Sequence, residues 1–289
     1  MNGPIVVTGA AGQLSSVILG TFGADVPVVG LRRDRMDIAD ARAVERVLGP
    51  LQPAVVINCA SYNDVDGAET SPVAALETNA FGVRTLARVA GSMGSLLVHY
   101  STDFVFDGTG TAPAAETDVA NPRSVYGASK LLGEWFALEA PGAYVLRVES
   151  LFGAGAAFEH RSSLSKIVTG LERGTEVPVF TDRTVSPSYV VDVAAATRAI
   201  IARRPAPGLY HCVNGGAATW EEVALEAARQ LGREPRLRRT TVADVALPAQ
   251  RPQYCALSNA KLAAAGITMP TWQDALRRYL AGRGQATTQ

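Results

Sequence analysis

Residues 5–15 read Ile5-Val-Val-Thr-Gly-Ala-Ala-Gly-Gln-Leu-Ser15, and this stretch decides the fold class. A β-branched run, a glycine-containing turn and a helix start follow one another here. The first glycine permits a tight turn, and the second lets the backbone approach a pyrophosphate at the helix N-terminus, where the helix dipole favours anions. Serine stands where a third glycine often permits close helix–sheet packing. The stretch predicts a dinucleotide site with contacts from Gly9, Gly12, Gln13 and Leu14.

The first half of the chain continues this alternation of strands and helices. Short apolar runs bounded by turns or helical patterns predict buried strands at Ile5–Thr8, Val26–Leu31, Ala54–Asn58, Leu96–Ser101 and Tyr144–Val148. Helical patterns lie between them at Gln13–Thr21, Asp40–Leu48, Val73–Met93 and Val125–Glu139. Alternation of this kind predicts an α/β fold, a doubly wound, Rossmann-type parallel sheet covered by helices on both faces.

After residue 153 the pattern changes to a mostly helical one. Helices are predicted at Ser163–Leu171, Val190–Ala202, Thr219–Leu231, Asn259–Ala265 and Thr271–Leu280, with strand-like pieces at Val177–Phe180 and Leu209–Val213. We therefore expect a nucleotide-binding domain over residues 1–153 and a smaller substrate-binding lobe over residues 154–289, with some elements interleaved between the two. The lobe is expected to close over the carboxyl edge of the sheet, where open α/β sheets bind ligands.

Composition excludes several classes of protein. The 289 residues include 27 basic and 27 acidic side chains, whereas a nucleic-acid binder would show a basic excess. No apolar run approaches the roughly 18 residues of a membrane span, and no basic leader precedes the first strand, which predicts a cytoplasmic protein without a membrane partner. Cys59, Cys212 and Cys255 are scattered without metal-type spacing, so reduced thiols are expected and no metal site.

The end of the second strand bears on the choice of cofactor. An acid usually stands there when a site binds the ribose 2′-hydroxyl of NAD, but this chain has Arg32 and Arg33. These cations suit a 2′-phosphate, which predicts NADPH, with NADH still possible because both arginines are also ordinary solvated loop residues. Asp37 and Ile38 follow, where the backbone and an apolar side chain are expected to flank the adenine.

Small residues follow the third strand at the same edge. Cys59-Ala60-Ser61-Tyr62 is expected to let the nicotinamide ribose and the phosphates pass close to the backbone. Asn79 lies in the helical pattern after this loop. It is interpreted either as a polar hinge within the helix or as an exposed helix residue.

A hydroxyl, a phenol and an ammonium form the candidate catalytic set. Tyr126 and Lys130 lie one turn apart on one helix face, and Thr102 follows an upstream strand. Together these groups can protonate a carbonyl oxygen while a hydride reaches the carbon. The Tyr-x-x-x-Lys spacing also arises by chance, so its meaning depends on the cofactor turn at Gly9.

Further motifs accompany this set along nearly the whole chain. They are Asn58-Cys-Ala-Ser-Tyr-Asn-Asp-Val-Asp66 with Glu69, Ser101-Thr-Asp-Phe-Val-Phe-Asp-Gly108, Ser186-Pro-Ser-Tyr189 with Asp192, Gly208-Leu-Tyr-His211, Arg251-Pro252 and Met269-Pro-Thr-Trp272. With the glycine turn and Tyr126-x-x-x-Lys130, they resemble an extended short-chain dehydrogenase/reductase, and most of all the dTDP-4-dehydrorhamnose reductase family.

The resemblance implies a role for each member of the catalytic set. Tyr126 would protonate the 4-keto oxygen of a nucleotide-linked sugar, Lys130 would hold the nicotinamide ribose and lower the phenol pKa, and Thr102 would hydrogen-bond the keto oxygen. Related sugar-nucleotide dehydratases carry an Asp-Glu pair after the threonine, whereas this chain has Asp103 followed by Phe104. That difference favours reduction without loss of water.

The residues expected to contact the substrate are Thr102, Asp103, Ser150 and Arg251. Ser150 stands where the family usually has a tryptophan that binds the sugar, so the identity of the sugar is open. Arg251 either meets the substrate diphosphate or, with Pro252, fixes a loop. Another deoxysugar 4-ketoreductase, an epimerase or dehydratase that retains NAD, and a non-catalytic relative such as a methionine adenosyltransferase regulatory subunit remain as alternatives. A monomer or a homodimer is expected.

Overall fold

The structure is a computed structural model, and it describes residues 3–22, 26–154, 158 and 162–286. Its centre is a sheet of six parallel strands in the order β10-β5-β4-β3-β1-β2. The strands are β1 (Ile5–Thr8), β2 (Val28–Leu31), β3 (Val55–Asn58), β4 (Leu96–Thr102), β5 (Tyr144–Val148) and β10 (Gly208–His211). The predicted doubly wound parallel sheet is confirmed.

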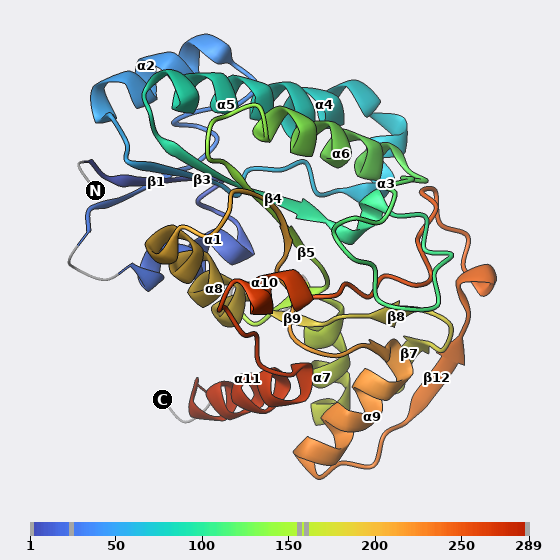
Figure 1. Cartoon of the computed structure of the whole chain (residues 1–289). Coiled ribbons are helices and arrows are strands. Elements are labelled where there is room, and N and C mark those ends of the chain that lie inside the picture. Colours follow the sequence, from blue (N-terminus) through green and yellow to red (C-terminus); the bar gives the residue numbers. More distant parts are fainter. Residues whose placement is uncertain (1–2, 23–25, 155–157, 159–161, 287–289) are drawn as a thin grey trace.

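Helices cover both faces of this sheet (Figure 1). One face carries α2 (Ala41–Leu51), α5 (Gly82–Ser92) and α6 (Val125–Ala137), and the other carries α1 (Gln13–Thr21) and α8 (Val190–Arg203). Each face has its own apolar core, because residues of a buried strand point alternately to the two sides. In β1, Val6 belongs to the core under α2 and α5, whereas Ile5 and Val7 belong to the core under α1 and α8.

The helix predicted over residues 73–93 is interrupted. It consists of α4 (Pro72–Leu76), a π-helical turn over Glu77–Phe81, and α5. A short helix, α3 (Val65–Thr70), precedes it without having been predicted; its six residues are too few for a periodic pattern to show. The second strand begins at Val28 rather than at Val26, after Pro27, whose nitrogen has no hydrogen to donate to a ladder.

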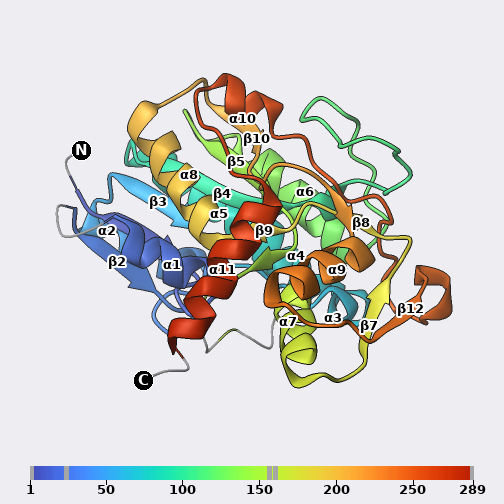
Figure 2. The same cartoon turned by 90° about the horizontal axis from the view of Figure 1, so that it is seen from below.

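The C-terminal half builds a second layer below the carboxyl edge of the sheet (Figures 1 and 2). Its apolar core lies among α7 (Ser163–Arg173), α9 (Trp220–Leu231) and α11 (Trp272–Ala286), beside β7 (Val177–Phe180) and β12 (Leu237–Thr240). Two short strand pairs accompany this core: β6 (Leu151–Phe152) pairs with β9 (Ser188–Tyr189), and β8 (Thr184–Val185) pairs with β11 (Ala218–Thr219). The helix α10 (Ala260–Ala264) lies near β10. None of the described helices is long and apolar enough to cross a membrane.

Two elements from the second half of the chain complete the first layer. β10 pairs with β5 along Gly208–His211, so this piece lies at the edge of the main sheet rather than in the helical lobe. α8 packs beside α1 on one face of the sheet. A four-residue apolar run carries no local sign of which strand it will pair with, and sequence alone therefore groups β10 with its neighbours in the chain.

Candidate active site

A cavity of 380 Å³ lies at the carboxyl ends of β1, β3, β4 and β5. This is the edge at which open α/β sheets bind ligands. Arg183 and Trp220 of the C-terminal half line it as well. It brings together most of the residues that the sequence nominated, namely Gly12, Gln13, Leu14, Cys59, Ala60, Ser61, Thr102, Asp103, Tyr126, Lys130 and Ser150.

The glycine turn closes tightly over the end of β3. Gly9 has φ +63°, and a Cβ placed on it would lie 2.6 Å from the backbone nitrogen of Ala60. The buried Ser15 hydroxyl donates to the Gly9 carbonyl at 2.7 Å and accepts from the Gly12 nitrogen at 3.1 Å. Ser15 thus ties the turn to the first turn of α1 by hydrogen bonds at the place where other fingerprints have glycine. The Nε2 atom of Gln13 is buried without a partner among the described residues.

Replacement of Gly9 by alanine is expected to destabilise the protein. A left-handed backbone costs a residue with a Cβ about 1–2 kcal/mol, and the clash with Ala60 adds to that cost. The free energy of unfolding in urea measures the loss. Gly20→Ala is the matched control, because Gly20 lies in α1 with nothing within 4 Å of the position that a Cβ would take, and it should gain up to about 1 kcal/mol. Equal effects of the two substitutions would contradict the assigned role of Gly9.

A buried polar chain holds the ends of β1, β3 and β4 in register below the cavity. Thr8 Oγ1 donates to Asn58 Oδ1 at 2.6 Å, and the Ala60 nitrogen donates to the same oxygen at 3.1 Å. Asn58 Nδ2 donates to Nδ1 of His99 at 3.0 Å, which places the proton of the neutral ring on Nε2. Burial, followed by the charge of Lys130, lowers the pKa of His99 well below its ordinary value. His99 therefore acts as a neutral structural group.

Asn79 fixes the loop after β3 from within the π-helical turn. Its side chain is fully buried, so the interpretation as an exposed helix residue is wrong. Oδ1 accepts from the Ser61 hydroxyl at 2.9 Å and from the Tyr62 nitrogen at 2.8 Å, and Nδ2 donates to the Tyr62 carbonyl and to Ser129 Oγ. π-Turns of this kind occur often at functional sites, and here the turn points an amide at the cavity wall.

Tyr126 lies in the wall of the cavity between Thr102 and Phe104. Its side chain is only 9% exposed, and its ring meets the Phe104 ring edge-on with centroids 5.5 Å apart. Burial and the charge of Asp103 raise the pKa of the Tyr126 phenol above its ordinary value, and the hydrogen bond with Thr102 opposes that rise. The phenol is therefore held in its protonated form, ready to donate.

Lys130 does not lower the pKa of the Tyr126 phenol in this structure. Its ammonium donates to the Tyr100 carbonyl at 2.6 Å, and it is not among the groups that shift the pKa of Tyr126. The expected lowering of the phenol pKa is thus not found in this structure, because burial dominates. Burial also lowers the pKa of Lys130 to about 8.

The remaining residues predicted for the cofactor lie outside the cavity wall. Arg32 is exposed at the end of β2 and makes no ion pair or hydrogen bond through its side chain with any described residue, whereas Arg33 pairs with Asp37 at 3.0 Å. Ile38 is buried against Gly82 of α5. Tyr62 packs in the cluster that contains Tyr126 without lining the cavity itself.

Arg251 joins the two halves of the chain. It forms an ion pair with Asp66 at 2.8 Å, and its guanidinium lies 5.7 Å from the centre of the Phe104 ring, behind the wall of the main cavity. It lines a neighbouring cavity of 370 Å³ instead. Its Nη1 is buried without a partner among the described residues. This placement matches the loop-fixing interpretation more directly than contact with a diphosphate.

Two charged residues that were not predicted from the sequence, Glu149 and Arg183, lie in the cavity wall with Asp103. At least one carboxylate oxygen of each acid lies within 4.8 Å of Cys255 Sγ and of the other acid. Ser150 has φ +43°, a strained conformation for a residue with a side chain, and its hydroxyl donates to Glu149 at 2.6 Å. Asp103, Glu149, Arg183 and Cys255 are far apart in the sequence, so only the predicted contact at Asp103 and the departure from the family pattern at Ser150 pointed to this wall.

A second cavity of 410 Å³ adjoins the first and shares Ser163, Arg183 and Trp220 with it. It lies between α7 and β7, and Lys166 and Arg173 add positive charge to its lining. An elongated anionic ligand can therefore extend from the first cavity into the C-terminal half.

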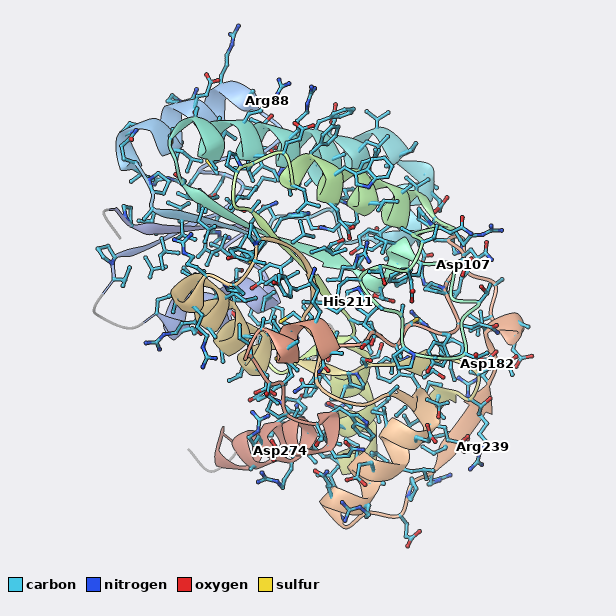
Figure 3. The ribbon with its side chains drawn as sticks, in the orientation of Figure 1. Arg88, Asp107, Asp182, His211, Arg239 and Asp274 are labelled. Atoms are coloured by element: carbon cyan, nitrogen blue, oxygen red, sulfur yellow. The ribbon has the colours of Figure 1, made fainter. Side chains whose placement is uncertain are left out.

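A buried ion pair supports α6, the helix that carries Tyr126 and Lys130. Glu134 on α6 accepts two bonds from Arg147 on β5, from Nε and from Nη2, each at 2.7 Å. The two side chains are 3% and 4% exposed. Ser101 of β4 also donates to Glu134 at 2.5 Å. The buried His211 of β10, which Figure 3 labels, has its Nε2 3.3 Å from Nη1 of Arg147. The pair thus joins α6 to three strands of the sheet.

Comparisons with known proteins show which family this chain is similar to. A sequence model of the family described as "RmlD substrate binding domain" matches residues 1–283. A dTDP-4-dehydrorhamnose reductase of Streptomyces griseus is 36% identical over 94% of this chain and 91% of its own length. A dTDP-4-keto-6-deoxy-D-glucose reductase of Streptomyces niveus is 34% identical over 94% of both chains.

Among solved structures, a dTDP-4-dehydrorhamnose reductase of Bacillus anthracis in complex with NADP superposes with a TM-score of 0.91. It is 27% identical in sequence, and the match covers 98% of this chain and 100% of that one. Full coverage in both directions means that the whole two-layer architecture, and not only the nucleotide-binding sheet, is common to the two proteins.

Proposed function

The chain belongs to the RmlD substrate binding domain family, and from that membership we propose that it is an NADPH-dependent reductase of a nucleotide-linked 4-keto-6-deoxy sugar. The observation that carries the proposal is the meeting of Thr102, Tyr126 and Lys130 in one cavity with the glycine turn. The Tyr-x-x-x-Lys spacing alone would not support the proposal, because it also arises by chance. The reaction class is that of the relatives, several of which are named as 4-keto sugar reductases.

In the proposed reaction, Tyr126 donates the proton that the sugar oxygen gains. The phenol is well suited because burial keeps it protonated until charge develops on that oxygen. The Thr102 hydroxyl, which donates to Asp103 Oδ1 in this structure, would rotate to donate a hydrogen bond to the same oxygen and so stabilise the developing charge. Lys130, with its pKa lowered to about 8 yet still mostly charged at neutral pH, supplies a positive charge beside the ribose.

NADPH fits the nucleotide end of the cavity. When bound, it supplies the hydride. Gly9, Gly12 and the first N–H groups of α1 would hold the pyrophosphate, since those groups have no partner within the helix. Nε2 of Gln13, which has no partner in the part of the chain that the structure describes, offers a further donor in the lining of the cavity. Cys59, Ala60 and Ser61 line the path between the turn and Tyr126, with no large side chain to block it.

Arg32→Ala is expected to lower kcat/KM for NADPH about 10- to 100-fold while leaving that for NADH nearly unchanged. A charge-assisted hydrogen bond contributes about 1.5–3 kcal/mol, and only NADPH has the 2′-phosphate to receive it. The exposed Arg35 on the same loop provides the control, because Arg35→Ala should alter neither value by more than about twofold. Equal losses with both cofactors in the Arg32 variant would remove Arg32 from cofactor selection.

The second cavity is the proposed place of the nucleoside diphosphate. Lys166 and Arg173 supply cations for phosphate oxygens, and Arg183 lies at the junction with the catalytic cavity. In this arrangement the sugar lies near Tyr126, between Asp103 and Ser150. Residues 1–153 would then bind mainly NADPH and residues 154–289 mainly the substrate, in a cytoplasmic enzyme that acts as a monomer or a homodimer.

A specific observation favours a second candidate within the same reaction class. Ser150 replaces the tryptophan usual in dTDP-4-dehydrorhamnose reductases, and Glu149 beside it adds an acid to the sugar end of the cavity. These two differences in the residues that line the sugar end of the cavity favour another 4-keto-6-deoxyhexose as substrate. The relative from Streptomyces niveus, named for dTDP-4-keto-6-deoxy-D-glucose, is in keeping with that alternative.

The proposal is tested by NADPH oxidation, followed by absorbance, with dTDP-4-keto-6-deoxyglucose and with its 3,5-epimerised product. Turnover with either substrate supports the proposal, and the ratio of the two kcat/KM values distinguishes the two candidates. A purified protein that carries tightly bound nicotinamide and needs no added NADPH would instead be an epimerase or dehydratase. No turnover of any 4-keto sugar, with intact cofactor binding, would favour a regulatory role.

A further inference from the structure

Two buried carboxyl groups lie in the wall of the cavity that also contains Tyr126, and the half-buried Arg183 guanidinium lies near them. Asp103 and Glu149 are 4% and 2% exposed, and their oxygens approach within 4.8 Å. Glu149 is held by the Ser150 hydroxyl at 2.6 Å and by the Ser186 nitrogen. Asp103 accepts from Thr102 through Oδ1 at 3.0 Å, whereas its Oδ2 is buried without a partner among the described residues.

The charges around this pair do not balance if both acids are ionised. The titratable groups that face it are Arg183, Cys255 and Tyr126. Arg183 is the one cation among these three, and its Nη2 lies 3.7 Å from Cys255 Sγ. The charge of one guanidinium can balance at most one carboxylate, and a second buried carboxylate so close to the first is strongly disfavoured. Holding one proton between the two acids makes the cluster neutral and gives the free Oδ2 of Asp103 a hydrogen to share.

The Thr102 hydroxyl connects this pair to the catalytic phenol. It donates to Asp103 Oδ1 at 3.0 Å, and it lines the same cavity as Tyr126, near enough to lower the pKa of the phenol. A hydroxyl both donates and accepts, so it can pass a proton along such a chain by rotating. We propose that Asp103 and Glu149 together hold one proton, and that this carboxyl pair returns a proton to Tyr126 through Thr102 after each reduction. The inference rests on the proposed function.

The transfer is balanced in atoms and charge. After Tyr126 has given its proton to the substrate oxygen, the O–H bond of Thr102 breaks toward the phenolate and the carboxyl O–H bond breaks toward the Thr102 oxygen. Phenol and hydroxyl are restored, and the carboxyl pair is left doubly ionised beside Arg183 until it takes one proton from water. No group is oxidised or reduced in these steps. Burial raises the pKa of both acids, Glu149 further because of the Asp103 charge, and the phenol remains the weaker acid that keeps the proton.

Glu149→Gln removes the shared proton while preserving the contacts of the side chain. The amide oxygen accepts from Ser186 and the amide nitrogen donates to Ser150. In the wild type, kcat should fall as pH rises through the apparent pKa of the pair, because the relay works only while the pair is protonated. In the variant Asp103 faces Arg183 without a competing acid, so its pKa drops. The fall in kcat should therefore begin about one pH unit or more lower.

Infrared spectroscopy of the resting protein tests the shared proton without turnover. At neutral pH the wild type should show a carboxylic acid C=O band that shifts in heavy water, and both Glu149→Gln and Asp103→Asn should lose it. Asp107→Asn is the matched control, because Asp107 belongs to the segment after β4 but is a solvated carboxylate with a lowered pKa, held by Thr109 and Asn121 (Figure 3). It should keep both the band and the pH profile.

Identical pH profiles for the wild type and Glu149→Gln would overturn the relay. A spectrum in which neither pair substitution removes a band would overturn the shared proton. Failure of the proposed function looks different, because the wild type itself would then oxidise no NADPH with either sugar substrate. If Glu149→Gln does not fold, as judged by circular dichroism, the profile of Asp103→Asn serves in its place.

Discussion

Tyr126→Phe is expected to lower kcat about 100- to 10,000-fold, the range over which a positioned general acid contributes to catalysis. The substitution removes one oxygen and leaves the ring in its edge-on contact with Phe104. Burial keeps the phenol protonated, so the wild type always has the proton available, and the variant has no other donor at that place. Initial rates of NADPH oxidation at saturating substrate give the loss directly.

NADPH affinity separates this effect from damage to the site. Binding of the cofactor, measured by calorimetry, should change less than about threefold, because the cofactor is held mainly by backbone and by other side chains. Tyr144→Phe serves as a control, since that hydroxyl bonds the Pro205 carbonyl near the opposite end of β5 from the cavity. A Tyr126→Phe enzyme with near wild-type kcat would mean that the substrate oxygen receives its proton from another group.

Arg147→Met should reduce the free energy of unfolding by about 3–5 kcal/mol. The arginine is buried, and its removal leaves the Glu134 carboxylate in the interior without its cation. Because domains of this kind are stabilised by only about 5–15 kcal/mol in total, the variant should unfold in far less urea than the wild type. The midpoint and slope of urea unfolding measure the change.

A double variant shows whether the loss comes from the unpaired charge. Arg147→Met combined with Glu134→Leu should recover most of the stability, because an apolar pair of similar volume often replaces a buried ion pair at little cost. Arg229→Ala breaks the exposed pair with Glu226 and should cost less than about 1 kcal/mol. If Arg147→Met and Arg229→Ala were equally mild, the buried pair would not be what holds α6 to β5.

The sheet and its first helices were predictable because their signals are local. β1, the glycine turn and α1 fall within residues 5–21, and each step is encoded by β-branched residues, glycine or helical periodicity in turn. The partner of β10 was not predictable from those signals. Its pairing with β5 depends on a long excursion of the chain, and the interruption at Asn79 depends on a contact with the loop at Ser61 that helical periodicity does not report.

The part of the candidate site that consists of sequence motifs was predictable. Thr102, Tyr126 and Lys130 meet in the cavity because each stands at the carboxyl edge of the sheet or on the helix beside it. The electrostatics were not predictable, since a pKa depends on neighbours in space. Lys130 donates to the Tyr100 carbonyl instead, and the pKa of Tyr126 is set mainly by burial and by the charge of Asp103. The Tyr-x-x-x-Lys spacing carries no information about either effect.

The late arrival of α8 and β10 has a consequence for synthesis on the ribosome. Until residues 190–211 have emerged, β5 lacks its outer neighbour and the apolar face that includes Ile5, Val7 and Ile18 lacks its α8 cover. A nascent chain that already contains the glycine turn and α6 therefore still exposes an unpaired strand edge and an apolar surface. Both features promote aggregation. The time that passes before α8 and β10 are synthesised therefore sets how long the partly made chain is at risk of aggregation.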